Sequence, residues 1–300
     1  MSPALFLFIG IAISLTGHPR SQELRAKLKV WGSRVLQWSI ILLGAKIPIG
    51  ELLEAGRTGL GMSLVSVLLV LGAGLLLQRF VRIEEAQARL ISSGTAICGG
   101  SAIAAVAPTI RARNIDIGVS IAVVFLLNAV AMMIFPPIGR MLGLTDPQFA
   151  AWAALAIHDT SSVVGAAAQW SDEALKLATT IKLSRTLWIF PLVLFFSWLA
   201  SRDPADPAAG AKKPGFAIPW FIGGFLLASL ASTLALKGGS PLPPMLARAS
   251  VPGFSVSLFL IGVSISREQL VKAGVRPLLF GIILWVLTLA GSLAFVRWGA

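Results

Sequence analysis

Two adjacent titratable residues, His158 and Asp159, lie near the middle of an apolar stretch, within the sequence LAIHDTSSVVGAA. A charge at the centre of a bilayer costs at least about 2.5–3.5 kcal/mol, so an acid there is expected to be paired, hydrated or protonated. Neighbouring residues of a regular helix point about 100° apart, so a direct contact between the two side chains requires a local break. The pattern predicts proton coupling or substrate contact at a central cavity. The alternative is a polar cluster that only joins helices.

A second polar interruption lies in Ser92–Pro108, SSGTAICGGSAIAAVAP. Its three glycines weaken a helix interior by about 1 kcal/mol each. Irregular backbone at membrane depth is tolerated only where it is buried in protein or lines a water-filled cavity. Thr95, Cys98 and Ser101 add small polar groups to the break. We therefore expect a discontinuous helix beside a solute pathway, with close packing through small residues as the alternative.

The two interrupted stretches resemble each other when TAICGGSAIAAVA is laid over LAIHDTSSVVGAA. The matching pairs are Ala96/Ala156, Ile97/Ile157, Ser101/Ser161 and Ala107/Ala167. This similarity predicts two facing, interrupted helices. The N-terminus of each second half-helix presents free N–H groups and a positive dipole end, which suit an anion.

Other polar residues of the apolar stretches could serve the same site. Lys182 and Arg185 are three residues apart and share a helix face. They could neutralise an anion or Asp159, or they could be interfacial side chains that extend towards the headgroups. Lys46 is expected to extend in that way, and Asn128 to form an interhelical hydrogen bond; a substrate contact is the alternative for both.

The composition predicts that these residues lie in a membrane. Of the 300 residues, 56% are hydrophobic and 13% are charged, against roughly 25% charged in soluble proteins. With about 20 apolar residues per span, ten segments are expected to form a single all-α transmembrane domain over residues 1–300. They are Pro3–Thr16, Ser33–Ile49, Thr58–Leu77, Leu90–Ile110, Ile117–Pro137, Gln148–Trp170, Ile181–Ala200, Ile218–Leu236, Ala247–Ser266 and Pro277–Arg297.

An internal repeat accompanies these segments. Ser39–Leu60 can be laid on Ser257–Leu278 without a gap, with eight identities that include Gly44/Gly262 and Gly56/Gly274. The copies begin in the second and ninth segments and would face opposite ways, as in the inverted repeats of secondary transporters. The chain is thus expected to be a polytopic helix bundle of about ten transmembrane helices, with an inverted repeat and two discontinuous helices.

The net charge of +12 arises from basic residues in short loops, as the positive-inside rule predicts, and His18–Arg34 is assigned to the cytoplasm. No contiguous basic face for nucleic acid is expected. One cysteine and two histidines predict no metal site, and no motif indicates a cofactor or an enzyme; an intramembrane enzyme is an unfavoured alternative. The expected partners are the lipid bilayer and a small anionic solute, and the sequence leaves open both a monomer and a homo-oligomer.

The blocks TAICGGSAIAAVAP and IHDTSSVVGAA, with LLGAKI, IKLSRTLWIFP and LFLIGVSI, resemble the YeiH family of bacterial inner-membrane proteins, which are described as sulfate exporters. The resemblance covers nearly the whole chain. It implies a multi-pass transporter of the bacterial inner membrane, related to the inverted-repeat folds of bile-acid and sodium/proton transporters. It also implies a further hydrophobic segment upstream. Ser162 stands where relatives have Gln, so an amide contact to substrate is not carried over.

The sequence therefore predicts a secondary transporter that exports a small anion such as sulfate or a sulfonate, coupled to protons or another ion. An uncoupled anion channel is the alternative. His158 and Asp159 are the predicted coupling residues. The predicted substrate-binding residues are Thr95, Cys98, Gly99, Gly100, Ser101, Thr160, Ser161, Ser162, Lys182 and Arg185.

Overall fold

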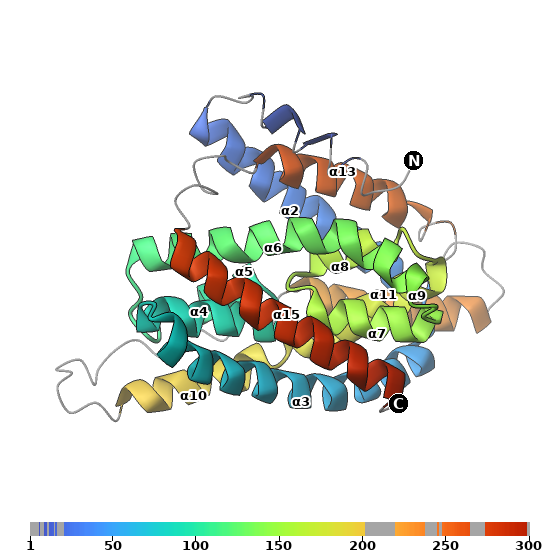
Figure 1. Cartoon of the computed structure of the whole chain (residues 1–300). Helices are drawn as coiled ribbons and strands as arrows, with labels where there is room; N and C mark the ends of the chain where they lie inside the picture. The colour runs from blue at the N-terminus through green and yellow to red at the C-terminus, as the bar shows by residue number, and fades with distance from the viewer. Residues whose placement is uncertain are drawn as a thin grey trace.

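The computed structural model describes residues 21–201, 220–237, 248–264 and 274–298, with isolated residues at 6, 9, 10, 12–14, 16 and 245. All regular elements in this part of the chain are α-helices, as predicted (Figure 1). They are α2 (Gln22–Gly44), α3 (Ile49–Val81), α4 (Glu85–Ala96), α5 (Gly100–Val106), α6 (Asn114–Met141), α7 (Asp146–Ala156), α8 (Thr160–Ala167), α9 (Asp172–Thr186), α10 (Ile189–Ser201), α11 (Trp220–Lys237), α13 (Ser250–Ser264) and α15 (Val275–Trp298).

Four helical stretches of the described residues are long and apolar enough to cross a membrane. They are Ile49–Val81, Asn114–Met141, Asp172–Leu199 and Val275–Trp298, and two shorter apolar helices cover Trp220–Ala235 and Pro252–Ser264. Large side chains such as Leu69 and Leu227 are 67% and 68% exposed, which is unfavourable in water but not against lipid tails. The membrane character is confirmed. Most of the first predicted segment, Pro3–Thr16, lies outside the described residues.

The fourth predicted span is a helical hairpin. Its two arms, α4 and α5, pack on each other: a Cβ placed on Gly94 would lie 3.1 Å from Cδ1 of Ile103. Nine residues of continuous helix would separate these positions by about 13 Å along the axis. The outer ends also meet, because Gln87 Nε2 before the turn donates to Asp116 Oδ1 after it, at 2.9 Å. The chain therefore leaves by the end through which it entered.

The sixth predicted span is a second hairpin, formed by α7 and α8. The rings of Phe149, near the start of α7, and Trp170, after α8, stack with centroids 4.1 Å apart. Trp170 Nε1 also donates to Oδ1 of Asp146, the first residue of α7, at 2.7 Å. Both interruptions thus occur where the sequence predicts them, but the predicted continuation across the membrane is wrong.

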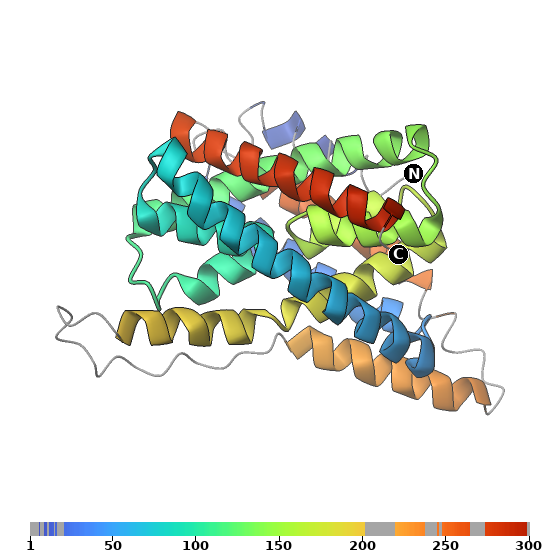
Figure 2. The same cartoon turned by 60° about the horizontal axis from the view of Figure 1, so that its bottom comes forward.

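The two hairpins enter the bundle from opposite ends. Figures 1 and 2 show α4 and α5 on one side and α7 and α8 on the other, with α6 running between the two ends. The reason lies in the topology: α3 ends where the first hairpin begins, α6 carries the chain to the far end, and the second hairpin begins there. The helices α9 and α10 then bring the chain back past both turns.

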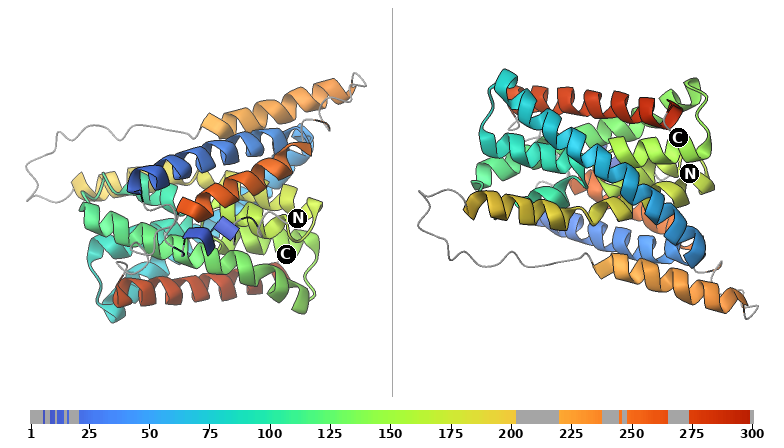
Figure 3. Two further views of the ribbon diagram at one scale, coloured as in Figure 1. Left: turned by 90° about the horizontal axis from the view of Figure 1, so that it is seen from above. Right: turned by 90° about the horizontal axis from the view of Figure 1, so that it is seen from below.

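The helices α2, α11 and α13 form a smaller group beside the hairpin-containing bundle, with α2 between the other two (Figure 3). Ser257 Oγ donates to the Gly32 carbonyl at 2.7 Å, and a Cβ on Gly253 would lie 2.1 Å from Ser39 Oγ. The helices α2 and α13 are therefore antiparallel and very close. This is the arrangement expected of the two copies of the proposed repeat, although the repeat itself stays a prediction.

We expect the hairpin topology to be visible in cysteine labelling from the two sides of the membrane. In a Cys98→Ala background, Glu84→Cys and Asn114→Cys should both react with an impermeant maleimide from one side. Met141→Cys and Glu173→Cys should both react only from the other side. All four native side chains are exposed at the ends of the bundle. A spanning fourth segment would instead place residues 84 and 114 on opposite sides, which would contradict the hairpin.

Candidate functional site

The turns of the two hairpins meet in the middle of the bundle. A Cβ placed on Gly99 would lie 3.1 Å from the Cβ of Asp159 and 3.3 Å from Cγ1 of Val124. Gly99 has φ +64° and ψ −125°, a region open essentially only to glycine. Its N–H donates to the Gly94 carbonyl at 2.8 Å and closes the turn. Glycine is thus required here both by the backbone conformation and by the approach of the second hairpin.

Asp159 is the N-cap of α8. Its Oδ1 accepts hydrogen bonds from the Ser161 N–H at 2.5 Å and the Ser161 hydroxyl at 2.6 Å. Its Oδ2 accepts from the Ser162 hydroxyl at 3.1 Å and from Asn128 Nδ2 at 3.2 Å. A carboxylate at this position satisfies N–H groups that have no partner within the helix and favours the positive end of the helix dipole. The sequence HDTSS therefore determines where α8 begins.

Asn128 lies midway along α6 and joins that helix to the second hairpin. Its Oδ1 accepts from the backbone N–H of His158 at 3.0 Å and of Asp159 at 3.3 Å, while its Nδ2 donates to the Asp159 carboxylate. The predicted interhelical hydrogen bond is confirmed. The amide thereby holds the non-helical backbone between α7 and α8 at the centre of the bundle.

Lys182 and Arg185 on α9 bind backbone carbonyls at the C-terminal end of α7, where the second turn begins. Lys182 Nζ donates to the carbonyls of Ala154 and Ile157, at 3.3 and 2.7 Å, in the last turn of α7 and just after it. Arg185 Nη1 donates to the carbonyls of Ala154, at 3.2 Å, and Leu155. Both cationic side chains are 0% exposed, so the alternative of interfacial side chains is wrong.

Arg185 also joins the two hairpins to each other. Its Nε donates to the Ala96 carbonyl at 2.6 Å and its Nη2 to the Thr95 carbonyl at 3.3 Å, both in the last turn of α4. The planar guanidinium has five N–H donors in a fixed arrangement, which lets one side chain serve carbonyls of two helices. Together with the contact between Gly99 and Asp159, this interaction fixes the two turns relative to each other.

Trp285 of α15 completes the capping of α7. Its Nε1 donates to the Ala156 carbonyl at 3.0 Å, so the carbonyls of residues 154 to 157 all have side-chain donors. Carbonyls at the end of a buried helix have no partner within the helix and would otherwise be costly to bury. This residue was missed at the sequence level, because a tryptophan in a span is ordinarily assigned to the lipid interface.

The electrostatics follow from these contacts. Neither Lys182 nor Arg185 forms an ion pair with a carboxylate of the described residues. Lys182 faces the C-terminal end of α7, and Arg185 faces the C-terminal ends of both α4 and α7. Such an end carries up to about half a negative elementary charge, and the N-terminal ends of α5 and α8 carry a similar positive charge. The meeting point of the turns is therefore positive on balance, with Asp159 as its acidic side chain.

The other predicted site residues lie around this meeting point, and some of them are buried whereas others are partly or fully exposed. His158 is fully buried, its ring 6.4 Å from that of Trp285, and neither ring nitrogen has a hydrogen-bond partner among the described residues. The side chains of His158 and Asp159 therefore do not bond to each other.

Thr95 and Cys98 are buried, and the Thr95 hydroxyl likewise has no partner in the described part. Ser101 is exposed, whereas Gly100, Asp159 and Thr160 are half-buried.

Lys46 lies at the edge of the bundle, and the described residues offer no cluster of metal-binding side chains. Lys46 Nζ lies 2.6 Å from Asp172 Oδ2, an ion pair between the end of α2 and the start of α9, away from the hairpin turns. The described residues contain no group of three or more His, Cys, Asp or Glu side chains that could hold a metal ion.

Comparisons with known proteins place the chain among membrane proteins. The family described as conserved hypothetical protein 698 matches residues 1–281. UPF0324 membrane proteins of Porphyromonas gingivalis and Bacteroides thetaiotaomicron are 42% and 39% identical over 301 and 300 residues, with 99% of this chain and 87% and 86% of the relatives covered. One from Vibrio parahaemolyticus is 44% identical over 267 residues, 88% of this chain and 83% of the relative. No solved structure matches.

We expect Gly99→Ala to destabilise the protein by about 1–3 kcal/mol, the cost of holding a side chain in this backbone region. The added Cβ would also push against Asp159. Thermal unfolding of the purified protein in detergent measures the effect. Gly118→Ala is the matched control, because nothing lies within 4 Å of the added Cβ. Equal melting temperatures for Gly99→Ala and the wild type would contradict the assigned turn.

We expect Arg185→Lys to lower the free energy of unfolding by about 2–5 kcal/mol although the charge is kept. Arg185 uses three nitrogens to reach carbonyls of α4 and α7, whereas the three N–H donors of lysine leave a single nitrogen and cannot reproduce all of these bonds. Each lost charged hydrogen bond is worth about 1.5–3 kcal/mol. Arg297→Lys is the control, since Arg297 also donates to a backbone carbonyl, that of Leu142 at 2.9 Å, but at the surface. The same unfolding assay compares them, and equal losses would refute the bridging role.

Proposed function

The chain belongs to the UPF0324 family of membrane proteins, the YeiH-like family that its sequence resembles, and we propose that it is a secondary transporter of a small anion. The proposed cargo is an inorganic or organic oxyanion such as sulfate or a sulfonate, exported with coupling to protons or another ion. The observation that carries the proposal is the meeting of two hairpin turns at mid-bundle, with buried cations behind them.

The charge distribution supports an anion as cargo. The positive charges of Lys182 and Arg185 exceed the partial negative charges of the two helix ends that they cap. Asp159 offsets part of the remainder, and the N-terminal ends of α5 and α8 add to it. A small anion could bind there without being removed from water into an uncompensated site.

The accessible side of the turns supplies groups that suit an oxyanion. Ser101 and Thr160 each carry a hydroxyl, and Gly100 leaves the backbone of α5 open to close approach. Ser161 and Ser162 already donate to Asp159, so they would act by orienting that carboxylate. Thr95 and Cys98 lie behind the turn, where they would shape the site.

Proton coupling is proposed for Asp159, which is half-buried and lies where the two turns meet. A proton on its carboxylate would remove the charge that competes with the anion and weaken the hydrogen bonds from Ser161, Ser162 and Asn128. His158 would take part through the backbone, since its N–H binds Asn128 while its ring packs near Trp285.

Internal symmetry supports alternating access. The arms of both hairpins end and begin at equivalent positions, Ala96 with Ala156 and Gly100 with Thr160, in agreement with the sequence similarity of the two turns. With the antiparallel α2 and α13, this similarity supports an inverted repeat, which would make inward- and outward-open states close in energy. About ten membrane-embedded segments, two of them hairpins, would then form the complete domain.

Uptake of radiolabelled oxyanions into vesicles that contain the purified protein tests the proposal. We expect transport of at least one of sulfate, sulfite, a sulfonate or a small carboxylate, stimulated by a pH gradient. Asp159→Asn should remove the pH dependence, because the one carboxylate that the described residues place at the turns is lost. Glu173→Gln, which removes an exposed carboxylate near the start of α9, should keep it.

Three outcomes would count against parts of the proposal. An absence of transport for every anion would reject the anion transporter, and unchanged pH dependence in Asp159→Asn would reject the coupling role. Currents far above about 10³ ions per second would indicate a channel, because a cycle limited by a millisecond domain motion cannot exceed roughly that rate.

A further inference from the structure

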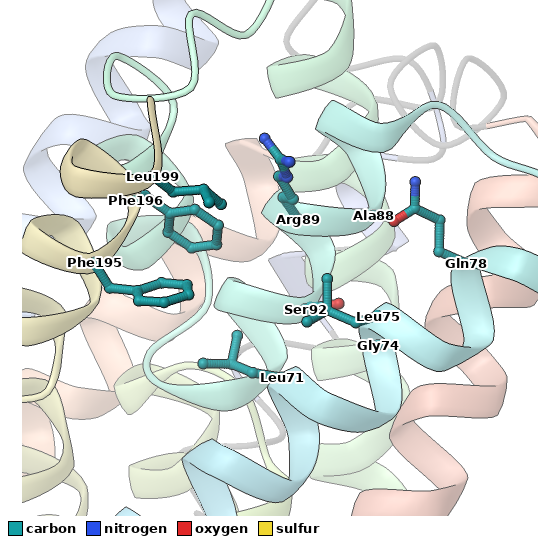
Figure 4. Close-up of a pocket in the computed structure, with 10 residues that line it drawn as sticks. All are labelled: Leu71, Gly74, Leu75, Gln78, Ala88, Arg89, Ser92, Phe195, Phe196 and Leu199. Atoms are coloured by element: carbon teal, nitrogen blue, oxygen red, sulfur yellow. The ribbon is translucent and has the colours of Figure 1, made fainter. Parts of the chain in front are cut away.

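A cavity of about 80 Å³, separate from the hairpin turns, opens between α3, α4 and α10 (Figure 4). Its walls are almost entirely apolar carbon, contributed by Leu71, Leu75, Phe195, Phe196 and Leu199 among others. We propose that it binds one acyl chain of an anionic phospholipid, with the headgroup at Arg89.

The cavity is open to the membrane. Leu75, Phe195 and Leu199 line it and are nevertheless 56%, 49% and 36% exposed. These side chains belong to the apolar stretches Ile49–Val81 and Asp172–Leu199, which are long enough to cross a bilayer. The surrounding molecules at this depth are lipid tails, so an acyl chain can enter from the side without crossing water.

The cavity is polar at one end only. On α3 it extends from Leu71 to Gln78, about 10 Å along the helix axis. Gln78 lies one turn before the end of α3, and Arg89 lies one turn after the start of α4, so this end is near the membrane surface. Figure 4 shows the Arg89 guanidinium at this end and Leu71 at the other. The polarity matches a lipid whose headgroup lies at the surface and whose tail points inwards.

Charge favours an anionic headgroup. Arg89 pairs with Glu85 of its own helix, but a guanidinium has five N–H donors and can bind a phosphate as well. Arg79 and Arg82, both exposed at the end of α3, add positive charge nearby. Basic residues close to the membrane surface attract anionic lipids.

Ser92 supplies an independent indication of a ligand. It lines the cavity and is 4% exposed, and its hydroxyl has no hydrogen-bond partner among the described residues. A buried hydroxyl without a partner is costly. Its oxygen packs against Gly74 of α3, and rotation of the side chain away from Gly74 would let the hydroxyl donate to an ester carbonyl of a phospholipid in the cavity. Figure 4 places Ser92 beyond Arg89 on the way into the cavity, where such an ester would lie.

Native mass spectrometry of the purified protein, equilibrated with equal amounts of phosphatidylglycerol and phosphatidylcholine with identical chains, tests the proposal. We expect the wild type to retain phosphatidylglycerol in preference. Leu71→Trp should fill the apolar end and abolish retention of both lipids. Arg89→Gln should reduce the preference by about fivefold, the attraction of one arginine for an anionic surface. Ser92→Ala should weaken retention of both lipids alike.

Matched controls separate this site from general lipid adhesion. Leu76→Trp changes an exposed residue of α3 outside the cavity, and Arg57→Gln removes an exposed arginine near the opposite end of the same helix; both should behave as wild type. Equal retention by Leu71→Trp and wild type would overturn the site. Should Leu71→Trp not fold, an unchanged preference in Arg89→Gln would overturn the proposal by itself. Neither result bears on anion transport.

Discussion

The arrangement of the hairpins depends on a single buried cation, the guanidinium of Arg185. Its N–H groups bind carbonyls at the C-terminal ends of both α4 and α7, two helices that enter the bundle from opposite ends. Without these donors, two helix ends would stop in the middle of the bundle with buried, unpaired carbonyls, which is costly. With them, the backbone can turn back at the centre of the bundle. The helix dipoles in turn stabilise a charge that has no carboxylate partner in the described part of the chain.

Both turns reverse the direction of the chain in the middle of the bundle, but they use different residues to do so. The second turn uses Asp159 to cap α8 and Asn128 to hold the irregular backbone. The first turn uses Gly99, whose conformation needs no cap and whose lack of a side chain lets Asp159 approach. The difference places the acidic group on one hairpin and leaves the start of α5 without a side-chain cap.

Sequence reasoning located both interruptions and the residues around them, but not the direction of the chain after each break. Leu90–Ile110 has the length of one span, and a hairpin of two half-length arms has the same length and the same apolar composition. Only contacts between distant residues, such as Gln87 with Asp116, decide between the two. One signal was available: arginines flank the segment on both sides, at 79, 82, 89, 111 and 113, which favours placing both ends on one side of the membrane. The roles of Lys182 and Arg185 as helix caps could not be predicted, because they depend on where the hairpins turn.

The bonds of Arg185 also limit which parts would move in the transport cycle that we propose. Separating the two turns would break the bonds of Arg185 to one of the two hairpins and leave buried carbonyls of that hairpin unpaired, at a cost of about 1–3 kcal/mol each. The hairpins and α9 are therefore expected to move as one body. The smaller group of α2, α11 and α13 touches this body over few positions, such as Gly165 of α8 against Leu258 of α13. Motion between the two groups requires none of the bonds made by Lys182, Arg185 and Asn128 to break, so the alternating-access movement that we propose would meet less resistance there than between the hairpins.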